Sequence, residues 1–317
     1  MLNPFISVII PCRYVDEVTK ECILRCKGLS YHPFEILLLP DEITDPISGV
    51  TIISTGPISP GAKRNIGIES SNGTLCAFID SDAFPTTDWL KTSIKYFIDS
   101  EVAAIGGPGI TPNSDSFMQK AGGHVLSSFM VGSLSKRVNG SSIMESVDVP
   151  SFNFIARKEV ILAVGGWNEH YWPGEDSLLC MAITTYGKKI LMVPDVVVYH
   201  HRRPLFLEHI KQVSNYGVHR GFFLKKYHGN SAKFVYFIPF FFVLFSVMAF
   251  IVALVNPNFR FSFILLFSIY IAVSLGTSLY QVRDFKMVVI VVMGIFVTHV
   301  CYGLSFMTGL LSGDLKK

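Results

Sequence analysis

Charged residues are scarce in this chain, and they are missing from most of its last quarter. The 317 residues are 50% hydrophobic and only 16% charged. No Asp, Glu, Lys or Arg occurs within Phe234–Phe259, Phe261–Val282 or Met287–Gly313. Each window is long enough to cross a bilayer core, which takes about 20 apolar residues in a helix. Helices of a soluble core usually keep a polar stripe, and these windows have none. The sequence therefore predicts a transmembrane region of about three helices over residues 234–313.

Cysteine pairs and glycine-rich nucleotide motifs are also missing. The six cysteines include no Cys-x-x-Cys pair and have no partners at zinc spacing, which favours reduced thiols in a cytoplasmic domain. No Gly-x-Gly-x-x-Gly follows the first strand and no Walker sequence occurs, so the dinucleotide and P-loop fingerprints are absent. The net charge of +3 is too small to imply nucleic acid. We expect no signal peptide, because Met1–Ile10 runs straight into a strand.

Apolar runs alternate with helical segments over the first 80 residues. We expect strands at Ile6–Pro11, Phe34–Leu39, Thr51–Ser54 and Leu75–Ile79, and helices at Asp16–Lys27 and Ala62–Ser70. This alternation predicts an α/β fold with a parallel sheet and right-handed crossovers. Such a sheet binds its ligands in a crevice at the carboxyl ends of the strands.

Two carboxylates stand at one of these carboxyl ends. Asp80-Ser81-Asp82 directly follows the apolar run Leu75–Ile79. Both acids can reach one hard cation, which takes oxygen ligands and shares them with phosphate. The open alternative is a solvated turn that happens to contain two acids. The neighbouring motifs favour the cation.

Several motifs, taken in order, resemble family 2 glycosyltransferases. In the N-terminal half they are Val8–Pro11, Pro60–Asn65 and Phe78–Asp82, and in the later half Phe152–Arg157, Val164–Glu169 and Trp172–Asp176. Each motif alone is weak, but their number, order and spacing are specific. The family has the GT-A fold, a Rossmann-like domain that binds nucleotide-diphosphate sugars. The resemblance thus implies a GT-A domain over residues 1–204.

The resemblance also implies a donor site with a metal ion. Asp82, and after it Asp80, would hold Mg²⁺ or Mn²⁺ against the donor diphosphate, with His200 completing the metal shell and Asp80 also facing the ribose. The remaining nucleotide contacts would come from Pro11, Asp41, Lys63, Arg64, Arg202 and Arg203. The family's usual Asp-Asp-Gly-Ser-Thr-Asp is replaced here by Pro40–Asp45, which leaves the base open. For Lys63, a solvated helix face is the alternative.

The catalytic pair implied by the resemblance is Glu175-Asp176. Asp176 matches the residue that deprotonates the acceptor in inverting members, a general-base role. Two acids that open a helix at Ser177–Tyr186 also suit a helix N-terminus, which is the structural alternative. Processive synthases of this fold carry Gln-x-x-Arg-Trp, where this chain has Gln212–Tyr216. That difference argues against a polymerising synthase.

A basic amphipathic segment over residues 205–233 precedes the apolar windows. Between Arg202 and Lys233 the only acid is Glu208. We expect an interface helix on an anionic cytoplasmic leaflet, and the alternative is a surface helix of the catalytic domain. The positive-inside rule puts this end in the cytoplasm. Three crossings would carry Lys316 and Lys317 to the other side against that rule, and a re-entrant third segment would remove the conflict.

These observations predict a metal-dependent, inverting glycosyltransferase in the cell membrane with its catalytic domain in the cytoplasm. The donor would be a nucleotide-diphosphate sugar, most simply a UDP-sugar. The acceptor would be a membrane-borne, lipid-linked saccharide of a glycan pathway. One alternative is a polyprenyl-phosphate sugar synthase, in which the lipid phosphate itself accepts the sugar. Another is a non-catalytic membrane scaffold that binds nucleotide without turnover.

Overall fold

The computed structural model describes residues 3–131, 142–227 and 229–315, whose contacts form two compact units. The first unit holds the described residues of Met1–Pro112 and Asn139–His201. The second holds those of Asn113–Val138 and Arg202–Lys316. Residues 113–131, which we expected in the first domain, therefore pack with the C-terminal helices. The prediction for Lys316 and Lys317 falls outside the described residues.

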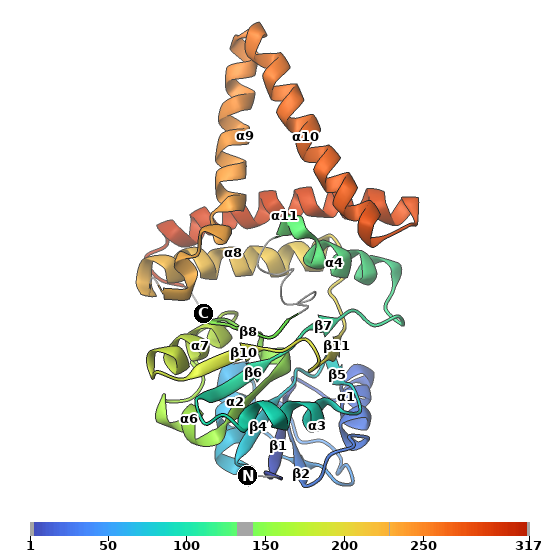
Figure 1. Cartoon of the computed structure of the whole chain (residues 1–317), viewed down its shortest axis with the longest axis vertical. Helices are drawn as coiled ribbons and strands as arrows, with labels where there is room; N and C mark the ends of the chain where they lie inside the picture. Colours follow the sequence, from blue (N-terminus) through green and yellow to red (C-terminus); the bar gives the residue numbers. More distant parts are fainter. Residues whose placement is uncertain (1–2, 132–141, 228, 316–317) are drawn as a thin grey trace. The chain divides into compact units, whose positions relative to one another are not determined.

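The first unit is organised around an eight-stranded sheet ordered β3-β2-β1-β4-β9-β6-β10-β8 (Figure 1). β1 (Ile6–Pro11) pairs in parallel with β2 (Phe34–Leu39) and with β4 (Leu75–Phe78). β2 pairs in parallel with β3 (Thr51–Ile52). β1 and β4 are buried along their whole length, as expected for parallel strands covered on both faces. The predicted parallel pairing is confirmed for these strands.

The parallel pattern ends at β9 (Phe154–Arg157), which lies antiparallel between β4 and β6 (Val102–Gly106). β10 (Lys189–Met192) pairs in parallel with β6, and β8 (Met144–Glu145) pairs antiparallel with β10. The sheet is therefore mixed, because the chain enters β9 from the edge at which β4 ends. This reversal brings residues 148–153 to the same edge as Asp80.

Helices cover both faces of the sheet, because successive side chains of a strand point to opposite faces. Val8 and Ile10 of β1 join one buried cluster, and Ile9 joins the other. Residues of α1 and α3 fill the first cluster, and residues of α2, α6 and α7 fill the second. The bounds are α1 Glu17–Lys27, α2 Pro60–Ser70, α3 Trp89–Ser93, α6 Lys158–Ala163 and α7 Glu175–Thr185.

A second, three-stranded sheet has the order β5-β11-β7. β5 (Ala83–Pro85) pairs antiparallel with β11 (Val198–His200), which pairs in parallel with β7 (Gly109–Ile110). The register sets Ala83 opposite His200. This pairing brings His200 to the turn that contains Asp80 and Asp82.

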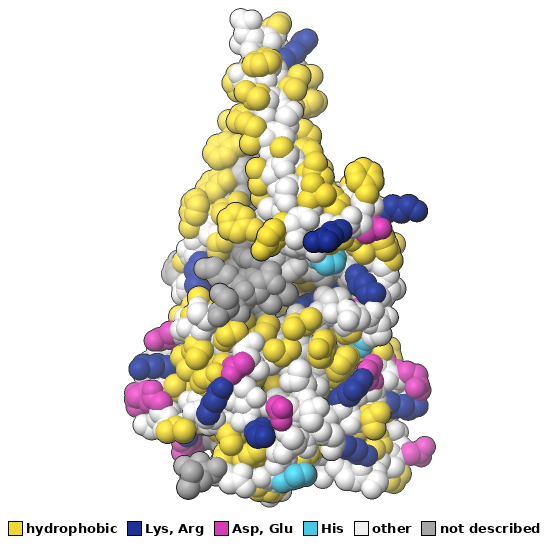
Figure 2. Space-filling view, turned by 45° about the vertical axis from the view of Figure 1, so that its right-hand side comes forward, with side chains coloured by type: hydrophobic (Ala, Val, Ile, Leu, Met, Phe, Trp, Pro, Cys, Tyr) yellow, Lys and Arg dark blue, Asp and Glu magenta, His cyan; other side chains and the backbone are white. Residues whose placement is uncertain are grey.

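The second unit is helical. It contains α4 (Phe117–Ser127), α8 (Leu207–Tyr227), α9 (Ile238–Val255), α10 (Pro257–Gln281) and α11 (Phe285–Leu311). The last three are each long and apolar enough to cross a membrane. α9 and α10 form a helical hairpin, and Figure 2 shows hydrophobic side chains along its surface. In an apolar 18-residue window of each helix, the share of buried residues is 6% in α9 and 11% in α10, but 44% in α11.

Candidate active site

The turn after β4 and the end of β11 form a cluster of metal-ligand type. Asp80, Asp82 and His200 each offer one ligand atom, and these atoms all lie within 4.8 Å of one another. His200 Nε2 lies 3.2 Å from Asp82 Oδ1, and the His201 amide donates to the Asp82 carbonyl oxygen at 3.0 Å. The Phe152 ring lies 4.4 Å from the His200 ring, centroid to centroid, and limits its movement.

The donor set of this cluster fits a divalent cation. Ligands bound at about 2–2.4 Å from one ion lie roughly 3–5 Å apart, which matches the spacing of the three atoms. Two carboxylates and one imidazole suit Mg²⁺ or Mn²⁺, and half-burial of all three residues leaves room for a phosphate oxygen or water. Asp80, Asp82 and His200 can therefore hold the ion that the sequence predicts.

Arg64 links this cluster to the second acidic motif. Its guanidinium donates from Nη2 to Asp80 Oδ1 at 2.7 Å and from Nη1 to Glu175 Oε1 at 2.8 Å. Nη2 also donates to Ser151 Oγ at 3.1 Å, and the guanidinium stacks over the Trp167 ring at 4.7 Å. The side chain is only 2% exposed. Arg64 thus fixes both acidic motifs to one planar group, and the phosphate contact expected of it remains a prediction.

Lys63 is also buried, on the other side of α2. Its ammonium donates to the carbonyl oxygens of Cys12 at 2.7 Å and Leu39 at 3.1 Å, and to Asp41 Oδ1 at 2.5 Å. Lys63 therefore links the end of β1, where Cys12 follows Pro11, to the end of β2 by hydrogen bonds. Its burial contradicts the alternative of a solvated helix face, and the predicted phosphate contact remains a prediction. Its position assigns it to holding the Asp41 carboxylate, which the sequence predicts as the base contact.

The pair Glu175-Asp176 opens α7. Gly174, the residue before it, has φ of +111°, a conformation that glycine adopts most easily. The helix begins two residues earlier than we expected, so both acids lie in its first turn. Glu175 is 3% exposed, whereas Asp176 is half-buried and accepts from the Ser177 amide at 2.8 Å. Asp176 is therefore the more accessible member of the pair.

Burial raises the pKa of Glu175 to about 7, with a further contribution from the Asp176 charge. The neighbouring Arg64 guanidinium opposes this rise but does not cancel it. Glu175 is enclosed and bound to Arg64, and the catalytic role expected of it remains a prediction.

Arg202 and Arg203 belong to the second unit. The Arg202 amide donates to Asp115 Oδ2 at 3.1 Å within that unit. The phosphate contacts expected of these arginines therefore remain a prediction. Ser151 and Phe152, which contact Arg64 and His200, were not anticipated as site residues, because no pattern in the sequence shows that β9 runs between β4 and β6.

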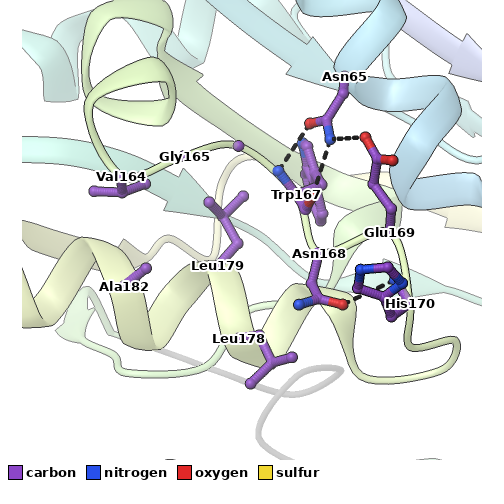
Figure 3. A pocket seen from close by; sticks show the side chains of 11 residues that line it. Asn65, Val164, Gly165, Trp167, Asn168, Glu169, His170, Leu178, Leu179 and Ala182 are labelled. Atoms are coloured by element: carbon purple, nitrogen blue, oxygen red, sulfur yellow. Dashed lines mark hydrogen bonds between the residues drawn. The ribbon is translucent and has the colours of Figure 1, made fainter.

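A separate hollow of about 360 Å³ lies beside α7 (Figure 3). It is lined by Asn65, by the loop Val164–His170 and by residues of α7. The Asn65 side chain fixes this loop through the Trp167 carbonyl oxygen at 2.9 Å and Glu169 Oε1 at 2.8 Å. Neither the metal cluster nor the pair Glu175-Asp176 lines the hollow, so it is distinct from the candidate active site.

Comparison with known proteins agrees with this geometry. The family model described as "Glycosyl transferase family group 2" matches residues 76–303. The pre-mycofactocin glycosyltransferase of Mycobacterium tuberculosis is 30% identical over 223 residues, which are 67% of this chain but only 46% of that protein. A Methanococcus voltae protein, 22% identical over 71% of this chain and 76% of its own length, is named dolichyl N-acetyl-α-D-glucosaminyl phosphate 3-β-D-2,3-diacetamido-2,3-dideoxy-β-D-glucuronosyltransferase.

A solved structure shares the fold along nearly the whole chain. It is the mannosyltransferase PcManGT from Pyrobaculum calidifontis, in complex with GDP-mannose and Mn²⁺. The TM-score is 0.65 at 13% identity, and the match covers 96% of this chain and 87% of that one. From the sheet that presents Asp80, Asp82 and His200 and from the extent of these matches, we conclude that the chain has the GT-A fold and belongs to glycosyltransferase family 2.

Proposed function

We propose that this chain is an inverting, multi-pass membrane glycosyltransferase whose catalytic unit lies in the cytoplasm. It transfers a sugar from a nucleotide-diphosphate sugar, most simply a UDP-sugar, to a lipid-linked saccharide. The observation that carries the proposal is the Arg64 bridge, which joins the cation-type cluster at Asp80 to Glu175 and so to the base Asp176. The apolar hairpin and the dolichyl-linked substrate in the name of the Methanococcus voltae relative support a lipid-borne acceptor.

The transfer is a single displacement at the anomeric carbon. The acceptor hydroxyl forms the new glycosidic bond on the face opposite the diphosphate, and the bond to the diphosphate oxygen breaks. Asp176 takes the hydroxyl proton as general base. Asp80, Asp82 and His200 would hold Mg²⁺ or Mn²⁺, which supplies positive charge to the departing diphosphate. Lys63 holds Asp41 in place for the nucleobase.

Turnover by the full chain in nanodiscs tests this proposal, with a panel of UDP- and GDP-sugars as donors. Each donor is offered with a lipid-linked saccharide and, separately, with polyprenyl phosphate. We expect transfer to the saccharide with inversion at the anomeric carbon. Transfer to polyprenyl phosphate alone would indicate the synthase alternative, and donor binding without turnover would indicate a scaffold.

Two substitutions separate the proposed roles. Asp176→Asn should keep donor binding and lower transfer by roughly 10²-fold or more, the scale of a lost general base. Asp82→Asn should weaken metal dependence and turnover together. Glu159→Gln, at an exposed position of α6, is the control and should leave both unchanged. Full activity of the Asp176→Asn variant, a retained anomeric configuration or undiminished turnover in EDTA would contradict the assignments.

A further inference from the structure

The path of α11 does not match that of a membrane-crossing helix. It has 27 residues, so its length of about 40 Å would suffice for a crossing. Yet α11 packs along α8 in the same direction (Figure 1). His209 Nε2 lies 2.8 Å from Thr298 Oγ1 near one end of the pair, and the Lys225 ammonium donates to the Ser312 carbonyl oxygen at the other.

The two helices approach each other closely at three glycines. A Cβ added at Gly217 of α8 would lie 2.7 Å from the Tyr302 carbonyl oxygen. One added at Gly221 would overlap the backbone of Phe306, and one at Gly309 of α11 would overlap the backbone of Val218. Residues 298–312 of α11 therefore keep a separation of about 8–10 Å from α8, so the two helices have the same tilt relative to the membrane.

α8 itself cannot cross the hydrocarbon. Glu208 and Lys211 are exposed near its start, and Lys225 and Lys226 are exposed at its end. A charged side chain inside a bilayer is costly and is found facing a protein interior or water. The apolar side of α8, which includes Val213, Phe222 and Phe223, is buried within the second unit.

α11 has the side chains needed to lie between α8 and lipid. Two of its polar residues, Thr298 and His299, face the protein: both are buried, and His299 bonds to the Tyr270 hydroxyl and the Met130 carbonyl oxygen. Its exposed large apolar residues are Phe285, Val289, Met293, Leu304, Met307 and Leu311. Lys286 in the first turn and Thr308, whose hydroxyl donates to the Leu304 carbonyl oxygen, are exposed as well. A helix with one covered face and one apolar exposed face suits the boundary between headgroups and acyl chains.

The hairpin meets α11 at its base. The aromatic contacts of α9 with α11 come from its first turns, where Phe237 and Phe240 touch Phe306. The remainder of α9, including Phe245, Phe250 and Leu254, exposes large apolar side chains, as lipid contact requires.

We propose that only α9 and α10 cross the membrane. α11 lies along the membrane surface, between α8 and the lipid. The chain then crosses twice, and its C-terminal end lies on the same side as the catalytic unit. Arg283 and Lys286, together with the basic residues of α8, lie on that side, and Arg260 stands at the opposite end of the hairpin. This distribution agrees with the positive-inside rule, and the terminal lysines of the sequence cease to be an exception.

Single added cysteines in the full chain test this topology without any activity measurement. Ser100→Cys marks the catalytic unit, Asn258→Cys the tip of the hairpin and Asp314→Cys the end after α11, and all three positions are exposed. Intact cells and permeabilised cells are treated with a membrane-impermeant maleimide. The unchanged chain measures background from native thiols, of which five are buried and Cys301 is half-buried.

We expect Asp314→Cys to label under the same condition as Ser100→Cys, and Asn258→Cys to label under the opposite condition. If Asp314→Cys instead labels together with Asn258→Cys, α11 crosses the membrane and the proposal fails. If all three variants label under one condition, the hairpin does not cross and the proposal also fails. The labelling of the two other variants is compared with that of Ser100→Cys, so the test is valid whichever side of the membrane the catalytic unit faces.

Discussion

At the scale of single residues, the site depends on buried cations that hold carboxylates in place. Arg64→Met would leave Glu175 and Asp80 without their shared partner. Removing one member of a buried ion pair costs about 3–5 kcal/mol, because the remaining charge stays desolvated. We therefore expect a large drop in thermal stability of the first unit and loss of turnover, measured by melting in nanodiscs and by transfer assays.

The matched control is Lys188→Met, which removes the partner of Glu101 in an ion pair whose side chains are 27% and 53% exposed. A pair of this kind contributes about 0–1 kcal/mol. Equal losses for the two variants would mean that burial of Arg64 adds nothing. Arg64→Lys is informative as well, because one ammonium cannot reproduce the planar fork that reaches both Asp80 and Glu175.

Glu175 gives the first unit a pH-dependent contribution to its free energy of unfolding. Its pKa in the folded chain is raised by burial from 4.5 to about 7. A raised pKa means that the folded state binds the proton more tightly, so this contribution is complete below pH 4.5 and is lost as the pH rises through 7. Between these values the unchanged protein should lose more stability than Glu175→Gln, as measured by melting temperature. Parallel pH profiles would contradict the raised pKa.

The sequence shows which residue types form the site but not how they are paired. Asp80, Asp82 and His200 could be predicted as one cluster, because a strand end and a motif resemblance point to each of them. The burial of Lys63 and Arg64 could not be predicted. Two adjacent cations on a short helix look solvated until the carboxylates on other elements are placed around them. Ser151 was missed because its contact with Arg64 also depends on where a distant element lies, in this case β9.

At the scale of elements, the predicted bounds match the structure where local sequence signals set them. β1 and β2 have the bounds expected from their apolar runs, and α1 begins after Asp16, which caps the Thr19 amide at 2.8 Å. Strand direction is set by the long-range path of the chain, so the antiparallel β9 was not foreseen. α11 shows the same limit, because an apolar window gives length and composition but not the helix beside which it lies.

The close contact of α8 and α11 can be tested through its glycines. Gly221→Ala should lower the melting temperature of the full chain in nanodiscs, because its Cβ overlaps the Phe306 backbone and overpacking costs about 1–3 kcal/mol. Gly276→Ala in α10 is the control, since nothing lies within 4 Å of its added Cβ. It should not destabilise the protein, because alanine favours a helix by up to about 1 kcal/mol over glycine. The contact is unimportant if the two variants melt together.

At the scale of the whole molecule, membrane retention and folding of the second unit depend on different segments. A chain that stops after Arg283 keeps α9 and α10 and should remain in the membrane after carbonate extraction. It should nevertheless melt at a lower temperature or aggregate, because the apolar side of α8 loses its cover, and burial of one large apolar side chain contributes about 1.5–3 kcal/mol. A chain that stops after Lys233 should be extracted. Extraction of the longer chain would show that α11 is needed for anchoring.

Because α8 and α11 run in parallel, the hairpin between them also serves as the connection that joins two parallel elements. Two adjacent parallel helices need a connection that returns the chain to its starting end, as strands do in a parallel sheet. Thr298 lies beside His209, so α11 begins 13 residues before the level of that contact, and the return from the end of α8 covers about 45 Å. The membrane hairpin is this crossover connection. A flexible linker of about 70 residues has a comparable end-to-end distance. Such a linker in place of α9 and α10 should therefore let α8 and α11 pair in the same register, in a protein that rests on the bilayer without passing through it.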